Sequence, residues 1–273
     1  MTVLAPRASL ARLHEVLTDL GPVVVAFSGG ADSAFLAKVA HDLLGADQVR
    51  CVTAVSASLA AEEEADCRAL AAEWGLRWTP VATDELADPA YVANGPDRCA
   101  RCKTALMEAL VPLAAGATVV LGVNVDDLGD HRPGQEAARE AGARFPLVEA
   151  GFTKADVRAW SEQLGLRTWD KPAAACLASR LPYGTPVTLS TLRSVADAES
   201  ALRLLGFTQL RVRHHGDVAR VEVEEADLAE VVRRRHQVVE AVRQAGYAYV
   251  ALDLEGFRSG SLNRVLAQAE AGS

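Results

Sequence analysis

Short apolar runs alternate with longer stretches rich in Ala and Leu along the first two thirds of the chain. The runs predict strands at 22–27, 48–55, 77–82 and 118–123, and the stretches between them predict helices at 32–44, 59–74 and 99–114. This order is typical of a parallel sheet covered by helices. The unbroken runs VVVAF and TVVLGV favour strands that are buried on both faces. We therefore predict an α/β fold for this part of the chain.

The predicted parallel-sheet domain ends with one more helix, and the pattern changes after Pro182. The segment TKADVRAWSEQLGL predicts one more helix, with Thr153 as its N-cap. After Pro182 the segments TLSTLRSVADAESALRLLG, TQLRVRHH, VARVEVE, ADLAEVVRRRHQVVEAVRQAG and YAYVALDL predict helix, strand, strand, helix and strand. The two strands joined by HGD read as an antiparallel hairpin. We expect a parallel-sheet domain over residues 1–172 and a smaller α+β domain over residues 173–273.

Composition excludes several classes of protein. The 273 residues are 50% hydrophobic, which is enough for a sizeable core. No run of about 18 apolar residues predicts a membrane span, and the start of the chain lacks the pattern of a signal peptide, so a cytoplasmic protein is expected. The net charge of -8 argues against broad binding to nucleic acid, because phosphate contacts need clustered Lys and Arg. Five cysteines without an export signal favour chemistry, metal binding or burial over disulfides.

The strongest local motif is SGGADS, which follows the first predicted strand. A tight Gly-Gly turn that leads into a helix directs backbone N–H groups at one spot, which suits a phosphate. The spacing and the lysine of a Walker A loop are missing. The motif resembles the pyrophosphate loop of the PP-loop ATPases, and the candidate nucleotide-binding residues are Ser28, Gly29, Gly30, Asp32 and Ser33.

A second loop, GVNVDDLGDHRPG, follows the last strand of the predicted parallel sheet. Gly122 permits close approach of the backbone, and Asp126, Asp127 and Asp130 form an acidic group. Ligands of open α/β sheets bind beyond the carboxyl ends of the strands, so the two loops are expected to border one crevice. We predict that Gly122 and Asp127 contact the nucleotide and that Asp127 and Asp130 hold Mg²⁺.

Three of the five cysteines are candidates for chemistry. Cys99 and Cys102 form a C-x-x-C pair, which can be half of a zinc site, a redox pair or two ligands of an iron–sulfur cluster. A second C-x-x-C is absent, and Cys176 is the available third ligand. Cys51 and Cys67 are interpreted as buried, small apolar residues.

The segment WDKPAAACLASRLPYG places Cys176 next to Ser179 and Arg180. A cation beside a thiol lowers the pKa of that thiol and raises its thiolate fraction. Arg211 and Arg213 alternate on one face of the hairpin, a spacing that suits the grip of a phosphate or carboxylate. The same charges also fit an exposed sheet face. Two carboxylates of this region are further candidate metal ligands, namely Glu199 and Glu222.

Taken together, the segments closely resemble the LarE sulfur transferases over nearly the full chain. The segments that carry the resemblance are SGGADS, DRCARCK, GVNVDDLGDHRPG, WDKPAAACLASRLPYG, AES and RVRHHGDVARVEV. The resemblance implies a Rossmann-like PP-loop domain of the adenine nucleotide alpha hydrolase type, joined to a C-terminal domain for substrate binding and oligomerisation. It also implies ATP as cosubstrate, a homo-oligomer, and a role in making the nickel-pincer nucleotide of lactate racemase.

The resemblance further implies the chemistry. A pyridinium mononucleotide with two carboxylates would be adenylated with the help of Mg²⁺, and the Cys176 thiolate would displace AMP. Arg211 and Arg213 would receive the nucleotide phosphate, with Ser179 and Arg180 beside the reacting carbonyl. The sulfur would come from Cys176 itself, leaving dehydroalanine, or from a sulfide on a [4Fe-4S] cluster held by Cys99, Cys102 and Cys176. The number and spacing of the cysteines leave both sources open.

Two other kinds of enzyme share a PP-loop. A tRNA thiolase needs a basic surface, which the net charge of -8 does not provide. An amidotransferase or synthetase of the NAD- or GMP-forming kind uses ammonia as its nucleophile, and Cys176 would then be structural.

Overall fold

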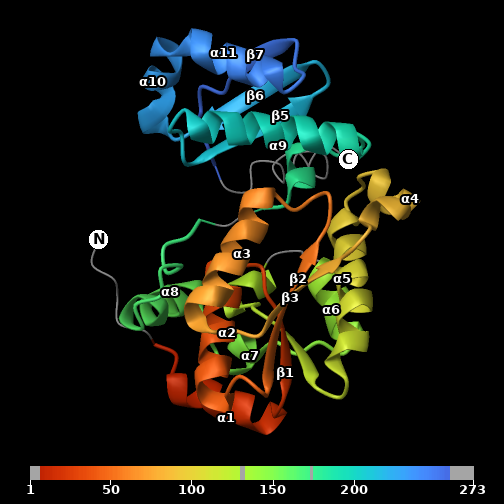
Figure 1. Cartoon of the computed structure of the whole chain (residues 1–273), viewed down its shortest axis with the longest axis vertical. Helices are drawn as coiled ribbons and strands as arrows, with labels where there is room; N and C mark the ends of the chain where they lie inside the picture. Colours follow the sequence, from red (N-terminus) through yellow and green to blue (C-terminus); the bar gives the residue numbers. More distant parts are fainter. Residues whose placement is uncertain (1–6, 130–132, 173–174, 259–273) are drawn as a thin grey trace. The chain divides into compact units, whose positions relative to one another are not determined.

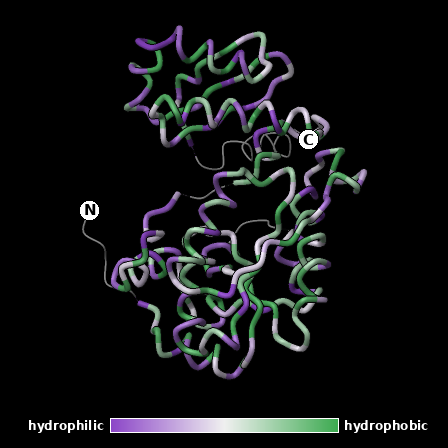
Figure 2. The backbone as a smooth tube through the Cα atoms, viewed as in Figure 1, coloured by the Kyte–Doolittle hydropathy of each residue, from purple (hydrophilic) through white to green (hydrophobic). Residues whose placement is uncertain are grey.

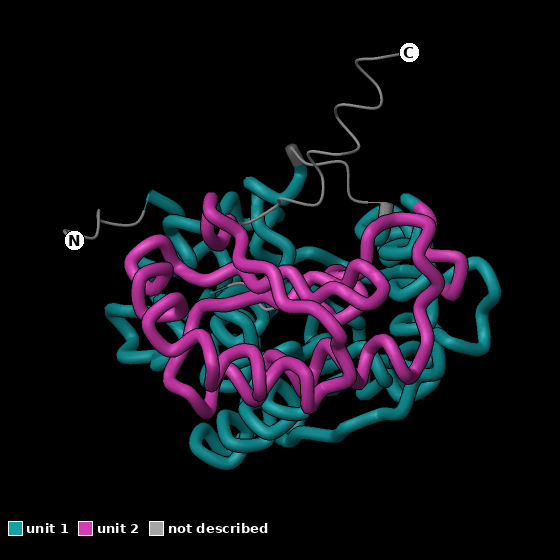
Figure 3. Tube along the Cα trace, turned by 90° about the horizontal axis from the view of Figure 1, so that it is seen from above, with its two compact units in different colours: residues 1–91, 96–174 teal, residues 92–95, 175–273 magenta. Residues whose placement is uncertain are grey.

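The computed structural model describes residues 7–129, 133–172 and 175–258. It divides into two compact units (Figures 1 and 3), one formed by residues 1–91 and 96–174 and the other by residues 92–95 and 175–273. The short segment around Asn94 joins the second unit because its side-chain amide donates to the carbonyl oxygens of Pro182 and Thr185 at 2.8 and 2.9 Å. No helix in the described ranges is long and apolar enough to cross a membrane.

A four-stranded parallel sheet forms the centre of the first unit (Figure 1). Its strands are β1 (Val23–Ala26), β2 (Val49–Val55), β3 (Trp78–Ala82) and β4 (Thr118–Leu121). They lie in the order β3-β2-β1-β4, so the chain crosses to the opposite side of β1 when it enters β4. The predicted Rossmann-like α/β fold is therefore confirmed, and each predicted strand matches an observed one.

Helices cover both faces of this sheet. They are α1 (Leu10–Leu20), α2 (Ala31–Leu44), α3 (Ala61–Trp74), α4 (Pro89–Val92), α5 (Arg98–Ala114), α6 (Pro133–Glu140), α7 (Pro146–Glu149) and α8 (Lys154–Gln163), with short 3₁₀ turns η1 (Glu85–Ala87) and η2 (Val125–Gly129). Val23 and Val25 of β1 pack with α1, α2, α3, α7 and α8, whereas Val24 packs with α5 and α6. Consecutive residues of a strand face opposite sides of the sheet, so an unbroken apolar run supplies side chains to the core on each side. Figure 2 colours the chain by the hydropathy of each residue.

The second unit is a three-stranded sheet with helices against one face. It contains η3 (Leu177–Arg180), α9 (Leu189–Leu204), β5 (Leu210–His215), β6 (Val218–Val223), η4 (Glu225–Asp227), α10 (Leu228–Arg233), α11 (Arg235–Gln244) and β7 (Tyr249–Leu252). The predicted hairpin is confirmed, because β5 and β6 pair antiparallel, and β7 then pairs parallel to β6. Val212 and Val221 face the helices, so the opposite face carries the alternating charged residues.

One predicted helix is wrong as a single element. The segment 226–246 forms η4, α10 and α11, with a break at Arg234. The Arg234 guanidinium donates to the Leu205 carbonyl oxygen at 2.7 Å and lies over the Phe207 ring at 5.6 Å. These contacts with a distant part of the chain accompany the departure from helical geometry, which local periodicity does not reveal.

Helix α8 begins as predicted at Thr153. Its hydroxyl accepts from the Asp156 nitrogen at 3.2 Å, and the Asp156 carboxylate accepts from the Thr153 nitrogen at 3.0 Å, which is a capping box. The same carboxylate accepts from the backbone nitrogens of Arg7 and Ala8, so this cap also holds the start of the chain. Burial acts to raise the pKa of Asp156, but these hydrogen bonds outweigh it and lower the pKa.

Replacement of Thr153 by Ala is expected to lower the free energy of unfolding of the first unit by about 1 kcal/mol, because one N-terminal amide of α8 loses its acceptor. Thr153→Ser is the matched control and should retain most of that stability. Hydrogen exchange of α8 amides at pH 7 measures the difference. Since the folded-state pKa of Asp156 is lowered, its stabilisation is present above its ordinary pKa and should be lost as the pH falls through the lowered value.

Candidate active site

The SGGADS motif forms the loop between β1 and α2, and the helix begins at Ala31. Gly29 has a φ of +67°, a conformation that side chains rarely adopt. A Cβ atom at this position would also lie 2.9 Å from the Cys67 sulfur. The loop therefore requires glycine at this point for its backbone conformation and for packing against α3.

Hydroxyl groups brace the loop from within. The Ser33 hydroxyl donates to the Gly30 carbonyl oxygen at 3.1 Å and accepts from the Ser28 nitrogen at 3.2 Å. The Ser28 and Ser33 hydroxyls are 3.0 Å apart. Below them, the Thr53 hydroxyl donates to the Phe27 carbonyl oxygen at 2.6 Å. These bonds hold the loop open at the N-terminus of α2, where positive partial charge favours an anion.

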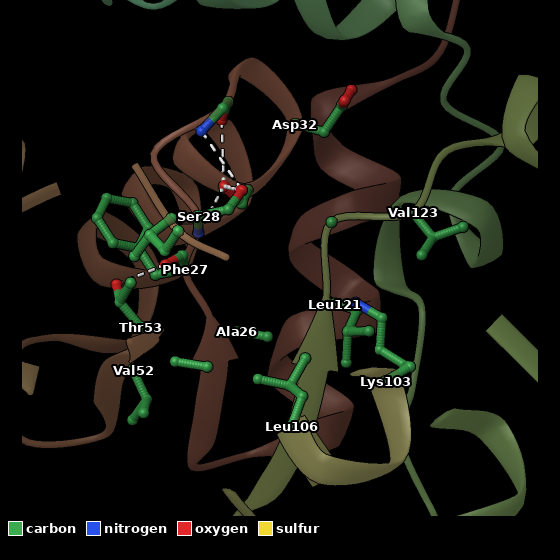
Figure 4. A pocket seen from close by; sticks show the side chains of 15 residues that line it. Ala26, Phe27, Ser28, Asp32, Val52, Thr53, Lys103, Leu106, Leu121 and Val123 are labelled. Atoms are coloured by element: carbon green, nitrogen blue, oxygen red, sulfur yellow. Dashed lines mark hydrogen bonds between the residues drawn. The ribbon is translucent and has the colours of Figure 1, made fainter. Parts of the chain in front are cut away.

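The loop forms one wall of a pocket of about 270 Å³ (Figure 4). The pocket brings together four residues predicted from the motif, Ser28, Gly30, Asp32 and Ser33, with Gly122 from the end of β4. The rest of the lining is mostly apolar, and consists of Ala26, Phe27, Val52, Thr53, Ala54, Leu59, Leu106, Leu121 and Val123 together with Lys103. An apolar cavity with a few polar groups at one end is the usual form of a nucleotide site.

Gly122 allows the end of β4 to contact the first turn of α2. A Cβ atom on Gly122 would lie 2.7 Å from the Ser33 nitrogen and 2.8 Å from the Ser33 Cα atom. The close approach predicted for this glycine is therefore an approach to the SGGADS helix itself. It joins the two predicted loops at one edge of the sheet.

The buried Asn124 connects the two loops by hydrogen bonds. Its side-chain amide donates to Asp32 Oδ1 at 3.1 Å, and its backbone nitrogen donates to Asp127 Oδ2 at 3.2 Å. Burial raises the pKa of Asp32 and the charge of Asp127 raises it further, although the bond from Asn124 opposes this. Two neighbouring carboxylates whose charges repel are stabilised by a divalent cation, so Asp32 and Asp127 fit a Mg²⁺ that also binds phosphate oxygens.

The other two acidic residues of the second loop are Asp126 and Asp130. Asp126 is exposed and accepts from the Lys154 nitrogen at 2.8 Å at the start of α8. Asp130, a predicted Mg²⁺ ligand, lies outside the described residues.

The five cysteines divide by exposure. Cys51 and Cys67 are buried as predicted, in the core that contains Val23 and Val25 of β1. Burial raises the pKa of Cys51 to about 12 and the pKa of Cys67 to about 11. Cys99 and Cys176 are exposed and Cys102 is partly buried. Cys99 and Cys102 lie three residues apart in the first turns of α5, on one face of that helix. Among the described residues no three His, Cys, Asp or Glu side chains are grouped for a metal ion.

Cys176 immediately precedes η3 in the second unit. Arg180 braces this turn, because its Nη1 donates to the carbonyl oxygens of Ala175 and Cys176 at 2.5 and 2.9 Å and to the Ser179 hydroxyl at 3.1 Å. Its Nε and Nη2 donate to Glu199 at 2.8 and 3.0 Å. Arg180 is itself buried, so the structure gives it the role of holding the backbone that carries the exposed thiol.

Glu199 is the centre of this network. Besides Arg180, its carboxylate accepts from the Val212 backbone nitrogen at 3.1 Å and from Arg203 at 3.0 Å. Burial acts to raise the pKa of Glu199, but the bond from Arg180 leads the interactions that lower it. The carboxylate thus compensates buried guanidinium charge and satisfies an amide of the edge strand β5. This donor set does not fit a metal ion.

Arg213 and Glu222 form a second buried pair, on the charged face of the hairpin. Nε and Nη2 of Arg213 donate to the two Glu222 oxygens at 3.0 and 2.9 Å, and Nη1 donates to the Ser179 carbonyl oxygen at 3.0 Å. Arg220 also donates to Glu222, at 3.1 Å. The alternation of charges predicted for the hairpin therefore produces internal pairing, and Glu222 does not fit a metal ion.

Arg211 differs from Arg213. It is partly buried and lies over the Phe257 ring at 5.0 Å. Burial, followed by the positive charges of Arg180, Arg213 and Arg203, lowers its pKa to about 10, although Glu199 acts in the opposite direction. A guanidinium crowded by other cations gains most from an anionic ligand.

Two residues of this region lay outside the sequence prediction, namely Asn124, which is bonded to the pocket residue Asp32, and Lys103, which lines the pocket. In the sequence, Asn124 gives no signal beyond its place after a strand end, and Lys103 gives none beyond its place next to Cys102. Burial lowers the pKa of Lys103, while the two cysteines raise it. The tertiary packing of α5 decides that Lys103 faces the pocket, so the sequence alone carries no signal for it.

The chain is similar to a known protein family and to several known proteins. A family model described as NAD synthase matches residues 12–93, which include the SGGADS loop. An uncharacterized protein of Synechocystis is 44% identical over 264 residues, covering 95% of this chain and 98% of the relative. The pyridinium-3,5-bisthiocarboxylic acid mononucleotide synthase of Lactiplantibacillus plantarum is 41% identical over 263 residues, covering 95% of each chain. An uncharacterized protein of Methanocaldococcus jannaschii is 24% identical over 240 residues, 87% of this chain and 91% of the relative.

Replacement of Gly122 by Ala is expected to weaken ATP binding at least tenfold, because the new methyl group would lie 2.7 Å from the Ser33 nitrogen and separate β4 from α2. Isothermal titration with ATP measures the loss, and circular dichroism checks that the sheet persists. Unchanged affinity in a folded variant would mean that this contact does not shape the pocket.

Replacement of Glu199 by Gln is expected to destabilise the second unit by about 3 kcal/mol, because the buried Arg180 charge loses its counter-charge. Hydrogen exchange of α9 and β5 amides measures this. The matched control Glu230→Gln breaks an exposed pair with Arg233 and should leave exchange unchanged. If Glu199 were a metal ligand instead, the metal-free protein would keep its stability and only metal affinity would fall.

Proposed function

Because the chain belongs to the family of the pyridinium-3,5-bisthiocarboxylic acid mononucleotide synthases, the LarE sulfur transferases, we propose that it converts the two carboxylates of pyridinium-3,5-biscarboxylate mononucleotide to thiocarboxylates. The resemblance seen in the motifs is confirmed by 41% identity over 95% of the chain. The chain is an ATP-dependent sulfur transferase of nickel-pincer nucleotide biosynthesis.

The first step we assign to the pocket of the first unit. A substrate carboxylate oxygen attacks the α-phosphorus of ATP, the bond between that phosphorus and the bridging oxygen breaks, and pyrophosphate leaves with the electron pair. The N–H groups of the Ser28–Ser33 loop and the N-terminus of α2 are suited to hold the departing phosphates. Mg²⁺ would neutralise charge on these phosphates, and Asp32 and Asp127 are the residues that would hold it.

The second step we assign to Cys176. Its thiolate attacks the adenylated carboxyl carbon, a C–S bond forms, and AMP leaves with the electrons of the broken C–O bond. The exposure of Cys176 and the hydrogen bonds from Arg180 to its own carbonyl oxygen support this role, because the thiol is presented on a fixed turn. Arg180 and Ser179 then act as positioning residues.

Arg211 is the better candidate for the substrate phosphate. Its charge is crowded by neighbouring guanidinium groups, whereas Arg213 is paired with Glu222. A phosphate at Arg211 would relieve that repulsion and hold the mononucleotide on the second unit.

Two sources of sulfur remain as hypotheses. In one, loss of the Cys176 α-proton breaks the Cβ–S bond and releases the thiocarboxylate, and the residue becomes dehydroalanine. In the other, a [4Fe-4S] cluster held by Cys99, Cys102 and Cys176 would supply a bound sulfide. Two exposed cysteines and one partly buried cysteine match the donor count of the second hypothesis, and the exposed Cys176 on a braced turn supports the first.

The observation that carries the proposal is the presence, in one chain, of a PP-loop pocket and of an exposed cysteine on an arginine-braced turn. An NAD-synthase-like match over residues 12–93 accounts for the pocket alone. Ammonia-dependent synthesis would leave Cys176 without a task.

We expect Cys176→Ser to retain pyrophosphate release that depends on ATP and the biscarboxylate nucleotide, and to form no thiocarboxylate, because the hydroxyl carries no sulfur. Mass spectrometry of the nucleotide and a pyrophosphate assay measure the two steps. If the variant still makes the sulfur product, the role assigned to Cys176 is wrong.

The double variant Cys99→Ser with Cys102→Ser separates the two sulfur sources. With a sacrificial cysteine, it should thiolate the substrate as the wild type does, and the Cys176 peptide should lose the mass of H₂S. With a cluster, anaerobically purified wild type should contain iron and acid-labile sulfide, and the double variant should lose both together with thiolation.

A further inference from the structure

Lys103 stands on the second turn of α5 and lines the same pocket as the SGGADS loop. Figure 4 shows its side chain on the side of the pocket formed by Leu106 and Leu121, with Ser28 on another side. Among the described residues that line this pocket, it is the one lysine or arginine. Lys103 is not among the predicted site residues, and it has no role in the proposed adenylation and sulfur-transfer steps.

The packing of α6 on α5 fixes the position of the Lys103 backbone. A Cβ atom at Gly134 would lie 2.9 Å from the Cys99 carbonyl oxygen and 3.3 Å from the Lys103 Cβ atom, so the two helices are in direct contact there. One turn further on, Met107 and Leu110 are buried in the core beneath the sheet. The stem of Lys103 therefore starts from a rigid point and extends along the pocket wall.

Within the described ranges, the charge of Lys103 has no carboxylate as a fixed counter-charge. In the part of the chain that the structure describes, neither a hydrogen bond nor an ion pair joins its ammonium group to another residue. Its neighbours along the pocket wall, Leu106, Leu121 and Val123, are apolar. A partly buried ammonium group that lacks a carboxylate partner is stabilised when an anion enters the pocket.

The other polar groups of the pocket select the kind of anion. The N-terminus of α2, a helix of 14 residues, and the loop around Gly30 supply partial positive charge. Asp32 is the one acidic residue in the part of the lining that the structure describes. Fixed donors on one wall and an ammonium group on another suit a chain of phosphates that carries several negative charges.

We infer that Lys103 is a catalytic residue of the adenylation step, whose ammonium group contacts the phosphate oxygens of ATP. Negative charge on these oxygens grows as the carboxylate oxygen bonds to the α-phosphorus and as pyrophosphate leaves with the electron pair of the broken bond. A flexible stem lets the ammonium group follow this charge, which the rigid loop does not do. The inference rests on the ATP-dependent activity, and on the proposed function only for the identity of the carboxylate.

The test compares Lys103→Met, Lys103→Arg and a matched control. Methionine keeps an unbranched stem to pack beside Gly134 but removes the charge, whereas arginine keeps the charge. The control is Arg101→Gln on the same helix, where the exposed Arg101 pairs with Asp97 at 3.2 Å outside the pocket. Carboxylate-dependent pyrophosphate release gives kcat and KM, and titration with α,β-methylene ATP gives the affinity without turnover.

We expect Lys103→Met to lower kcat by about 100-fold, which is typical of the loss of one donor that serves the transition state, and to bind α,β-methylene ATP less tightly. Lys103→Arg should recover part of kcat, and Arg101→Gln should match the wild type. The inference is overturned if Lys103→Met keeps kcat and analogue affinity within twofold of the wild type, or if Lys103→Arg loses as much as Lys103→Met.

The analogue titration keeps the inference separate from the proposed substrate. If the wild type releases no pyrophosphate with the biscarboxylate nucleotide, the proposed function fails, and binding of α,β-methylene ATP still decides the role of Lys103. Equal analogue affinity of the wild type and Lys103→Met would then overturn the inference, and weaker binding by Lys103→Met would support it.

Discussion

The nucleotide pocket depends on how closely the end of β4 approaches the first turn of α2. Strands β1 and β4 pair in parallel. Val23 lies opposite Thr118 and Ala26 lies opposite Leu121, so the two strands end at the same level of the sheet. The residue directly after β4 is Gly122, and a side chain there would overlap the Ser33 backbone. This contact brings together Asp32, Asn124 and Asp127, which come from two distant segments. The position at the strand-order reversal is where open α/β sheets bind their ligands.

In the second unit, a buried ion pair between Arg180 and Glu199 holds the turn that carries Cys176. Glu199 compensates Arg180, and through Arg180 it determines the course of the turn that carries Cys176. Breaking such a pair leaves an uncompensated charge in the interior, so the thiol is presented by an element that is costly to rearrange. The Arg213 pair with Glu222 strengthens the same turn through the Ser179 carbonyl oxygen. The charged face of the hairpin is therefore structural for the most part.

The elements of the fold were predictable because each depends on local signals. Apolar runs of the right length matched the four parallel strands, and Thr153 marked the start of α8. The prediction failed at Arg234, where the helix breaks beside Leu205 and Phe207, residues that lie about 30 positions earlier. The pairing of Glu199 and Glu222 with arginines was equally hidden, because an alternating charged strand has the same pattern whether it faces solvent, a ligand or its own counter-ions.

The sequence by itself determined the α/β class, the phosphate-binding loop and the family, since these rest on turn chemistry, periodicity and motifs that lie close together in the chain. The tertiary structure decided which charged groups are available for chemistry. It buried Arg180, Arg213, Glu199 and Glu222 in mutual pairs, and it directed Lys103 into the pocket without a partner among the described residues. The physical reason is that the charge state and reactivity of a side chain depend on burial and on neighbours brought from elsewhere in the chain, and spacing along the sequence records neither.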